Sequence, residues 1–211
     1  MRKRCLIISG GEECPLPADM QKAEYVIACD RGYLYAERLG LKPDLIVGDF
    51  DSAPFPVTEI PVERLPSRKD DTDTMIAARH AAEIGFDEIV ILCCFGGRLD
   101  HTLANIQTAA WLAERGMTVR LAGADAEAAV FTSGTLRFPR REGRSLSLFS
   151  LSDRCEGVRI RGTKYDGQDL TLTNAFPLGV SNVWTTEEAE ITVKTGILLV
   201  MQSGLKEGEH I

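Results

Sequence analysis

The sequence predicts two domains of different class: a doubly wound, mostly parallel α/β domain in residues 1–126 and a β-sandwich domain in residues 127–211. Up to about residue 124, short apolar runs alternate with helical patterns, which is typical of a parallel sheet covered on both faces. After about residue 128 the pattern changes to short, often alternating segments separated by Gly, Asp, Asn and Pro, at the spacing of a sandwich. No low-complexity linker separates the two patterns, so we expect a tight boundary.

The first domain has the rhythm of repeated strand–helix–strand units. Apolar positions such as Met75, Ala78 and Ala82 recur at helical spacing, which gives that helix a face for the sheet. The expected strands are residues 4–9, 25–30, 44–50, 88–95 and 118–124, and the expected helices are residues 30–40, 72–84 and 101–115.

The second domain contains only strand patterns. Its segments are short and bounded by turn residues, as in an all-β fold. The expected strands are residues 128–134, 135–139, 145–152, 157–162, 169–174, 179–185, 188–194 and 196–202.

Composition limits the function classes. A chain of 211 residues with 44% hydrophobic residues is ordinary globular material, and no apolar run has the length of a membrane span or a signal sequence. We therefore expect a soluble, cytoplasmic protein with no membrane partner. The net charge of −7 disfavours nucleic acid as a partner and means that bound polyphosphate needs metal ions as intermediaries. The six cysteines form no C-x-x-C pair, which favours reduced, buried thiols without disulfides or zinc.

Acidic residues follow two of the predicted strands. Asp30 comes after the second strand, and Asp49 and Asp51 end the third, at the edge where ligands bind in open parallel sheets. In an extended segment, residues two apart point the same way, so Asp49 and Asp51 can both present oxygens to one hard cation. The alternative is that they only cap a turn, because Asp is a common turn residue.

A second acidic group surrounds a predicted helix start. The run "SRKDDTDTM" places Asp70, Asp71 and Asp73 within four positions. One acid there is explained by capping and by the helix dipole, but three repel one another unless a cation lies among them. Together with Asp49 and Asp51, this group favours a site for a metal ion on a nucleotide's phosphates.

The segment "FGGRLDH" follows the strand at 88–95. Gly96 and Gly97 let the backbone approach a ligand, and Arg98 can bind a phosphate through two parallel hydrogen bonds. The alternative is a strand-to-helix turn with Asp100 as its cap. The sequence has neither a P-loop nor a G-x-G-x-x-G fingerprint, and it lacks G-x-S-x-G and H-E-x-x-H, so those enzyme classes are not supported.

Taken in order, the motifs "DRG", "VGDFDS", "KDDTD", "GGRLDH", "KYDGQDL" and "GVSN" resemble those of the thiamine pyrophosphokinase family over nearly the whole chain. The resemblance implies an α/β nucleotide domain followed by a β-sandwich. It also implies transfer of diphosphate from ATP to the hydroxyl of thiamine, giving thiamine diphosphate and AMP with Mg²⁺. The family resemblance further implies a homodimer whose active site is shared between subunits.

The resemblance assigns expected roles to individual residues. Many relatives carry "DGG" where this chain has Asp30, Arg31 and Gly32, which is a departure at the nucleotide side. The base for the thiamine hydroxyl is Asp73 or Asp100, and the sequence leaves both open. The expected catalytic residues are Asp49, Asp51, Asp73 and Asp100, with Asp49, Asp51 and Asp73 on the metal; the nucleotide residues are Asp30, Gly32, Lys69, Thr72 and Arg98; the thiamine residues are Tyr165, Ser181 and Asn182.

Two other functions are compatible with the same residues. One is a diphosphokinase for another primary alcohol, such as a hydroxymethyl pterin, which could use the same metal and ATP. The other is a non-catalytic nucleotide-binding module, although a module that only binds gains little from so many repelling carboxylates.

Overall fold

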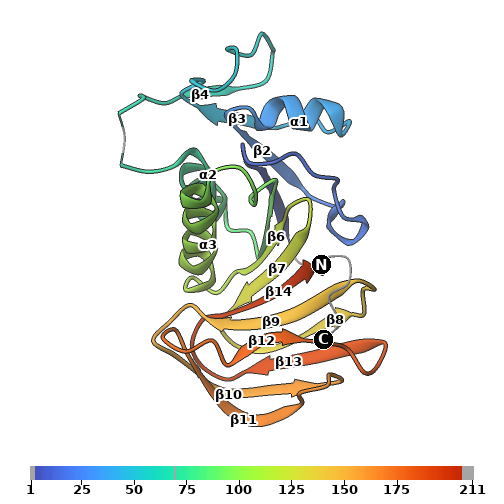
Figure 1. Ribbon diagram of the computed structural model, residues 1–211. Coiled ribbons are helices and arrows are strands. Elements are labelled where there is room, and N and C mark those ends of the chain that lie inside the picture. The colour runs from blue at the N-terminus through green and yellow to red at the C-terminus, as the bar shows by residue number, and fades with distance from the viewer. Residues whose placement is uncertain (1–2, 69, 206–211) are drawn as a thin grey trace. The chain divides into compact units, whose positions relative to one another are not determined.

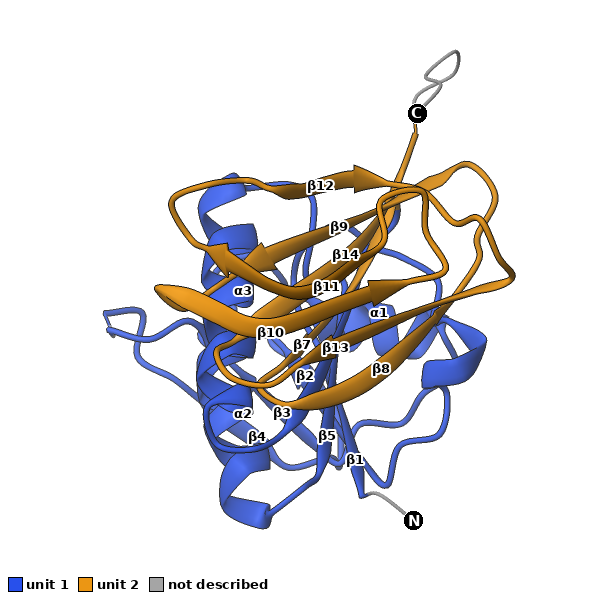
Figure 2. Cartoon of the chain, turned by 90° about the horizontal axis from the view of Figure 1, so that it is seen from below, with its two compact units in different colours: residues 1–124 blue, residues 125–211 orange. Residues whose placement is uncertain are grey.

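The structure, a computed structural model, describes residues 3–68 and 70–205. The chain divides into two compact units, Met1–Ala124 and Asp125–Ile211 (Figure 1, Figure 2). The first unit is an α/β domain and the second is all-β, as the sequence predicts. None of the helices in the described ranges is long and apolar enough to span a bilayer.

The first unit is built on a parallel sheet. Its strands lie in the order β6-β5-β1-β2-β3-β4, and every neighbouring pair is parallel. The central strand β1 is fully buried from Cys5 to Ile8, because it pairs on both edges and is covered on both faces. The strands are β1 Arg4–Ile8, β2 Tyr25–Cys29, β3 Leu45–Gly48, β4 Val62–Arg64, β5 Glu88–Leu92 and β6 Thr118–Ala122.

Helices cover the two faces of this sheet (Figure 1). Helix α1 packs on the face that carries Leu6 and Ile8, through Tyr35 and Ala36. Helices α2 and α3 contact each other and lie on the opposite face. The helices are α1 Gly32–Arg38, α2 Asp73–Ile84 and α3 Leu99–Ala113, with a 3₁₀ turn, η1, at Ala18–Met20.

The order of the strands reverses between β1 and β5. From β1 the chain moves through β2 and β3 to β4 on one side, and then returns to β5 on the other side. The turn after β1 joins the end of β5, since Gly11 N donates to Cys93 O (3.0 Å) and Glu12 N donates to Phe95 O (3.1 Å). In open α/β sheets this reversal marks the ligand-binding edge.

Two details of the first unit differ from the sequence prediction. Strand β4 was not expected, because its three residues, Val62–Arg64, contain a single apolar side chain. Helix α3 begins at Leu99, two residues earlier than expected, so Asp100 lies inside its first turn and Arg98 occupies the N-cap position.

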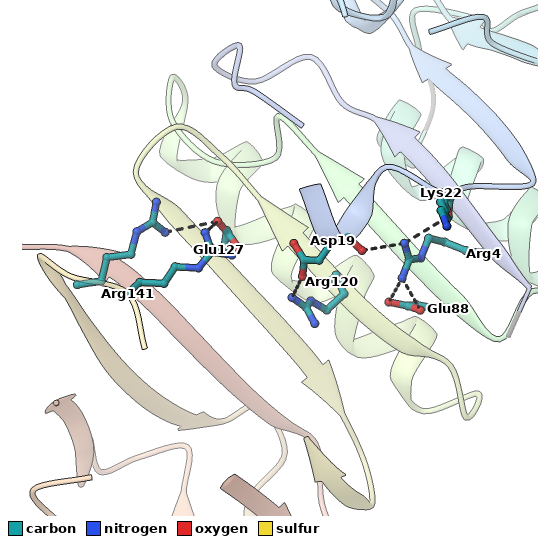
Figure 3. A network of polar contacts seen from close by, with 8 residues as sticks. Arg4, Asp19, Lys22, Glu88, Arg120, Glu127 and Arg141 are labelled. Atoms are coloured by element: carbon teal, nitrogen blue, oxygen red, sulfur yellow. Dashed lines mark hydrogen bonds and ion pairs between the residues drawn. The ribbon is translucent and has the colours of Figure 1, made fainter. Parts of the chain in front are cut away.

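Ion pairs join the start of β1 to its neighbours (Figure 3). The Arg4 guanidinium lies 3.1 Å from the Glu88 carboxylate of β5 and also donates to the backbone oxygens of Asp19 and Lys22. Arg120 on β6 contacts Asp19 at 3.0 Å. These contacts hold η1 beside β1 and β6.

The second unit is a sandwich of two antiparallel sheets, which confirms the predicted all-β class. Within this unit, the strands of one sheet lie in the order β12-β9-β14-β7, and those of the other lie in the order β11-β10-β13-β8. Their apolar side chains form a single buried cluster, into which the Trp184 ring extends while its Nε1 donates to Phe138 O (2.9 Å). Arg141 forms a 2.7 Å ion pair with the nearly buried Glu127 (Figure 3). The strands are β7 Ala126–Phe131, β8 Gly134–Pro139, β9 Arg144–Ser150, β10 Arg154–Arg161, β11 Gly167–Thr173, β12 Gly179–Asn182, β13 Glu188–Val193 and β14 Leu198–Gly204.

All six cysteines are buried and free of disulfides, as the sequence predicts. Burial raises the pKa of Cys5 to about 12 and raises the pKa of Cys29 well above its ordinary value. We therefore expect the folded protein at pH 8 to react with Ellman's reagent at a small fraction of the rate of an unfolded chain, with all six thiols reacting in guanidinium. Rapid reaction of several thiols without denaturant would contradict the burial.

Candidate active site

Asp30 lies directly after β2 and against β3. Its backbone is left-handed (φ 46°), and its N–H donates to Val47 O at 2.8 Å. A Cβ on Gly48 would lie only 3.0 Å from the Asp30 Cα, so glycine at 48 permits this close approach. The Asp30 side chain is 9% exposed, and within the described ranges its Oδ1 is buried without a hydrogen-bond partner. A buried carboxylate oxygen in this state is a ready ligand for a cation, because leaving it unsatisfied costs free energy.

Asp49 and Asp51 converge through a turn and not through an extended strand, which corrects the expected geometry. Strand β3 ends at Gly48, and Phe50 has a left-handed backbone (φ 60°). The Asp51 N–H donates to Asp49 Oδ1 at 3.3 Å, so Asp49 also caps the turn. The side chain of Phe50 is held at the surface by the Phe55 ring, with the ring centroids 5.0 Å apart.

The carboxylates of Asp30, Asp49 and Asp51 form a three-acid cluster, because each offers an oxygen within 4.8 Å of the others. Mg²⁺ prefers carboxylate oxygens and keeps several waters, so three such ligands at the edge of a sheet fit it. The buried Oδ1 of Asp30 supports this fit. The sequence named all three residues but did not place Asp30 among the metal ligands.

Asp73 is the first residue of α2 and lies outside the three-acid cluster. The helix is capped by Thr72, whose Oγ1 accepts a hydrogen bond from Met75 N at 3.1 Å. The Cys29 thiol donates to the backbone oxygen of Asp73 at 3.7 Å. The pKa of this thiol is raised by burial and then by the charges of Asp73 and Asp30, so the start of α2 lies near the end of β2.

Two further residues of the run "SRKDDTDTM" are Asp71 and Lys69. Asp71, which precedes α2, forms a 2.9 Å ion pair with Arg79 of that helix, so its place in the sequence has an explanation that needs no ligand. Lys69, which was expected to bind the nucleotide, lies outside the described residues.

The turn after β5 presents Arg98. Gly96 and Gly97 both have left-handed backbones (φ 79° and 64°). Arg98 is 72% exposed and forms a two-point pair with Asp100, with Nη2–Oδ2 at 2.6 Å and Nε–Oδ1 at 3.1 Å. That pairing raises the pKa of Arg98, as does the negative charge of Asp51, so the guanidinium lies within electrostatic range of the three-acid cluster. The same hydrogen bonds lower the pKa of Asp100.

Asn105 is a supporting residue that the sequence analysis missed. It is 4% exposed, and its Nδ2 donates to Cys94 O at 2.8 Å, which ties α3 to the end of β5 and so fixes the turn that carries Arg98. An asparagine on the inner face of a predicted helix was the available signal.

In the second unit, the buried Asn182 side chain hydrogen-bonds the backbone around Tyr165. Its Oδ1 accepts hydrogen bonds from the backbone N–H of Tyr165 and Val183, both at 3.0 Å. Its Nδ2 donates to Thr163 Oγ1 at 2.9 Å and to Tyr165 O at 3.0 Å. The Asn182 side chain is 4% exposed, so its amide is fully used within the unit.

The two other expected thiamine residues are accessible. Tyr165 is 59% exposed, and Ser181 is exposed with a left-handed backbone (φ 60°). A groove of about 120 Å³ lies between β9 and residues 172–178, but Tyr165, Ser181 and Asn182 do not line it. It is also smaller than the roughly 300–1,000 Å³ of ordinary ligand pockets.

Replacing Asn182 should destabilise the second unit. We expect Asn182→Ala to lower the free energy of unfolding by about 1–3 kcal/mol, because four hydrogen bonds of a buried amide are lost. Urea denaturation measures this change. Asn174→Ala, at an exposed position, is the matched control and should stay within about 0.5 kcal/mol of the unsubstituted protein. An equal effect of both substitutions would show that the Asn182 network does not stabilise the fold.

A doubly wound sheet with clustered acids at its carboxyl edge, followed by a β-sandwich, defines a two-domain α/β protein with an acidic site at the edge where such sheets bind ligands. Within that class, residues 17–121 match the family model "Thiamin pyrophosphokinase, catalytic domain", and residues 134–198 match "Thiamin pyrophosphokinase, vitamin B1 binding domain". The chain belongs to the thiamin pyrophosphokinase family.

Individual relatives agree with this assignment. The chain is 27% identical over 188 residues to the thiamine pyrophosphokinase of Bacillus subtilis, covering 84% of this chain and 86% of that protein. The crystal structure of the Bacillus subtilis thiamine pyrophosphokinase superposes with a TM-score of 0.81 at 26% identity, covering 96% and 99% of the two chains. That of a family protein from Enterococcus faecalis gives a TM-score of 0.75 at 26% identity, covering 97% and 100%.

Proposed function

We propose that this protein is a thiamine diphosphokinase, which transfers diphosphate from ATP to the hydroxyl of thiamine and releases AMP. The observation that carries the proposal is that the two thiamin pyrophosphokinase domain models match in order, one on each structural unit. The three-acid cluster supports it, because diphosphate transfer requires neutralisation of a highly charged group.

In this proposal the first unit binds and orients ATP. Asp30, Asp49 and Asp51 would hold Mg²⁺, which supplies positive charge to the phosphates when bound. Arg98 binds a phosphate through its two parallel N–H groups and leaves Asp100 to do so. The thiamine oxygen attacks the β-phosphorus, the bond from that phosphorus to the α–β bridging oxygen breaks, and AMP leaves.

A carboxylate would accept the proton of the thiamine hydroxyl. Asp73 and Asp100 are the two candidates. Hydrogen bonds from Arg98 lower the pKa of Asp100 while that pair is intact, and Asp73 lies at the start of α2, which Thr72 caps.

The second unit would bind thiamine, which is a cation. The exposed Tyr165 ring suits a cation, and Asn182 fixes the backbone that carries it. Ser181 is accessible for a further hydrogen bond. From the family resemblance we propose that the protein is a cytoplasmic homodimer with shared sites, so light scattering should give about twice the chain mass of 23.2 kDa.

The test is product analysis with ATP, Mg²⁺ and thiamine. We expect AMP and thiamine diphosphate in equal amounts and no AMP without thiamine. ADP as the product would contradict diphosphate transfer. AMP release that responds to a hydroxymethyl pterin and not to thiamine would favour the other diphosphokinase, and ATP binding without any turnover would favour the binding module.

A further inference from the structure

Arg31 connects the turn after β2 to the turn after β3. Its Nε donates to Ser52 Oγ at 3.1 Å, and Ser52 Oγ in turn donates to Asp30 Oδ2. Arg31 and Asp30 are adjacent in the chain, whereas Ser52 directly follows Asp51. The three side chains therefore form a hydrogen-bonded chain that joins the two turns carrying the three-acid cluster.

This chain of hydrogen bonds engages one oxygen of Asp30 and not the other. Oδ2 accepts from Ser52, while Oδ1 is buried with no hydrogen-bond partner among the described residues. The backbone of Asp30 is already fixed by its contact with Gly48. The hydrogen bond from Ser52 limits rotation of the Asp30 carboxylate about its Cβ–Cγ bond, because one of its two oxygens is held in place.

The stem of Arg31 is also held in place. A Cβ on Gly10, in the turn after β1, would lie 3.3 Å from Arg31 Cγ, so the arginine stem runs directly against that glycine. The guanidinium is thus directed at Ser52 rather than free in solvent. Through Ser52 it is linked to Asp30, which is one of three clustered carboxylates.

We propose that Arg31 and Ser52 are positioning residues that present Asp30 to the metal through its Oδ1 oxygen and thereby set the affinity for the divalent cation. The proposal rests on the metal site of the proposed function. Neither residue contacts the reacting groups in this account. Each acts through Asp30, and because they act in series their effects should not add.

The test is a titration of the protein with Mn²⁺ in the absence of nucleotide, in which electron paramagnetic resonance measures the free metal. We expect Ser52→Ala and Arg31→Met each to raise the dissociation constant for Mn²⁺ by about 10-fold, with the double variant no worse than the weaker single variant. Ser52→Thr keeps the hydroxyl and should restore binding. Arg38→Met, at the far end of the helix that follows Arg31, is the matched control and should bind Mn²⁺ normally, because Arg38 contacts Glu13 and the Tyr35 ring.

Turnover provides a second readout. In Ser52→Ala and Arg31→Met the Mg²⁺ concentration for half-maximal activity should rise, while the KM for thiamine stays unchanged. Unchanged Mn²⁺ affinity in folded Ser52→Ala, or additive losses in the double variant, would overturn the inference. If either result is found while the unsubstituted protein makes thiamine diphosphate, only the inference about Arg31 and Ser52 fails. If the unsubstituted protein forms no AMP from ATP, Mg²⁺ and thiamine, the proposed function itself fails.

Discussion

Asp51→Asn should lower thiamine-dependent AMP release by at least about 10³-fold and leave the protein folded. In the proposed function, the substitution removes one charged ligand of the metal, whose positive charge would stabilise the transferred diphosphate. A 10³-fold loss corresponds to about 4 kcal/mol of transition-state stabilisation. The fold should not weaken, because the substitution also removes repulsion among the three carboxylates.

The matched control for this variant is Asp71→Asn. Asp71 belongs to the second acidic group, at the start of α2, but pairs with Arg79, so AMP release should change by less than about 2-fold. A steady-state assay of AMP, with thermal unfolding of each variant, makes the comparison. An Asp51→Asn protein that keeps most of its Mg²⁺-dependent activity would contradict the role of the cluster.

Arg98→Met should lower kcat/KM for ATP by about 10²-fold, with little change in the KM for thiamine. The guanidinium can donate two parallel hydrogen bonds to a phosphate. Methionine has a similar apolar stem but no donor and no charge. Because Arg98 is exposed, stability should change by less than about 0.5 kcal/mol.

Arg115→Met is the control at the other end of α3. There the guanidinium lies 3.6 Å from the centre of the Trp111 ring, away from the turn after β5, and its loss should leave kcat/KM for ATP within about 2-fold. Separate titrations of ATP and thiamine decide the outcome. If the substitution changed only the KM for thiamine, Arg98 would act on thiamine and not on ATP, which would contradict this assignment.

The fold was predictable because its signals are local. Buried parallel strands such as Cys5–Ile8 appear in the sequence as continuous apolar runs, and the alternating segments of the second unit appear with period two. Strand β4 gives neither signal, since Val62–Arg64 is short and mostly polar and forms only by pairing with β3. Its existence depends on a tertiary contact that local pattern does not contain.

The site was predictable in its residue types and less so in its geometry. Asp49 and Asp51 were expected to converge along an extended strand, but the left-handed Phe50 between them makes a turn instead. A phenylalanine gives no sign of this conformation, which for a non-glycine residue is set by its surroundings. The entry of Asp30 into the cluster likewise depends on its close approach to Gly48 across two strands.

Asn182 shows the same limit in the second unit. The family resemblance marked it for thiamine, which stays a prediction, and in the structure its amide hydrogen-bonds the backbone around Tyr165. A sequence motif identifies a residue that matters to a site, but only the fold shows whether that residue touches the ligand or positions one that does.

The central claim is that the carboxylates of Asp30, Asp49 and Asp51 hold a divalent cation on the phosphates of ATP. A crystal grown with Mn²⁺ and α,β-methylene ATP, which cannot release AMP, tests it through the anomalous signal of the metal. We predict one peak at ligand distance from oxygens of all three residues and from the nucleotide's phosphates. A metal and nucleotide bound away from these three carboxylates would contradict the account.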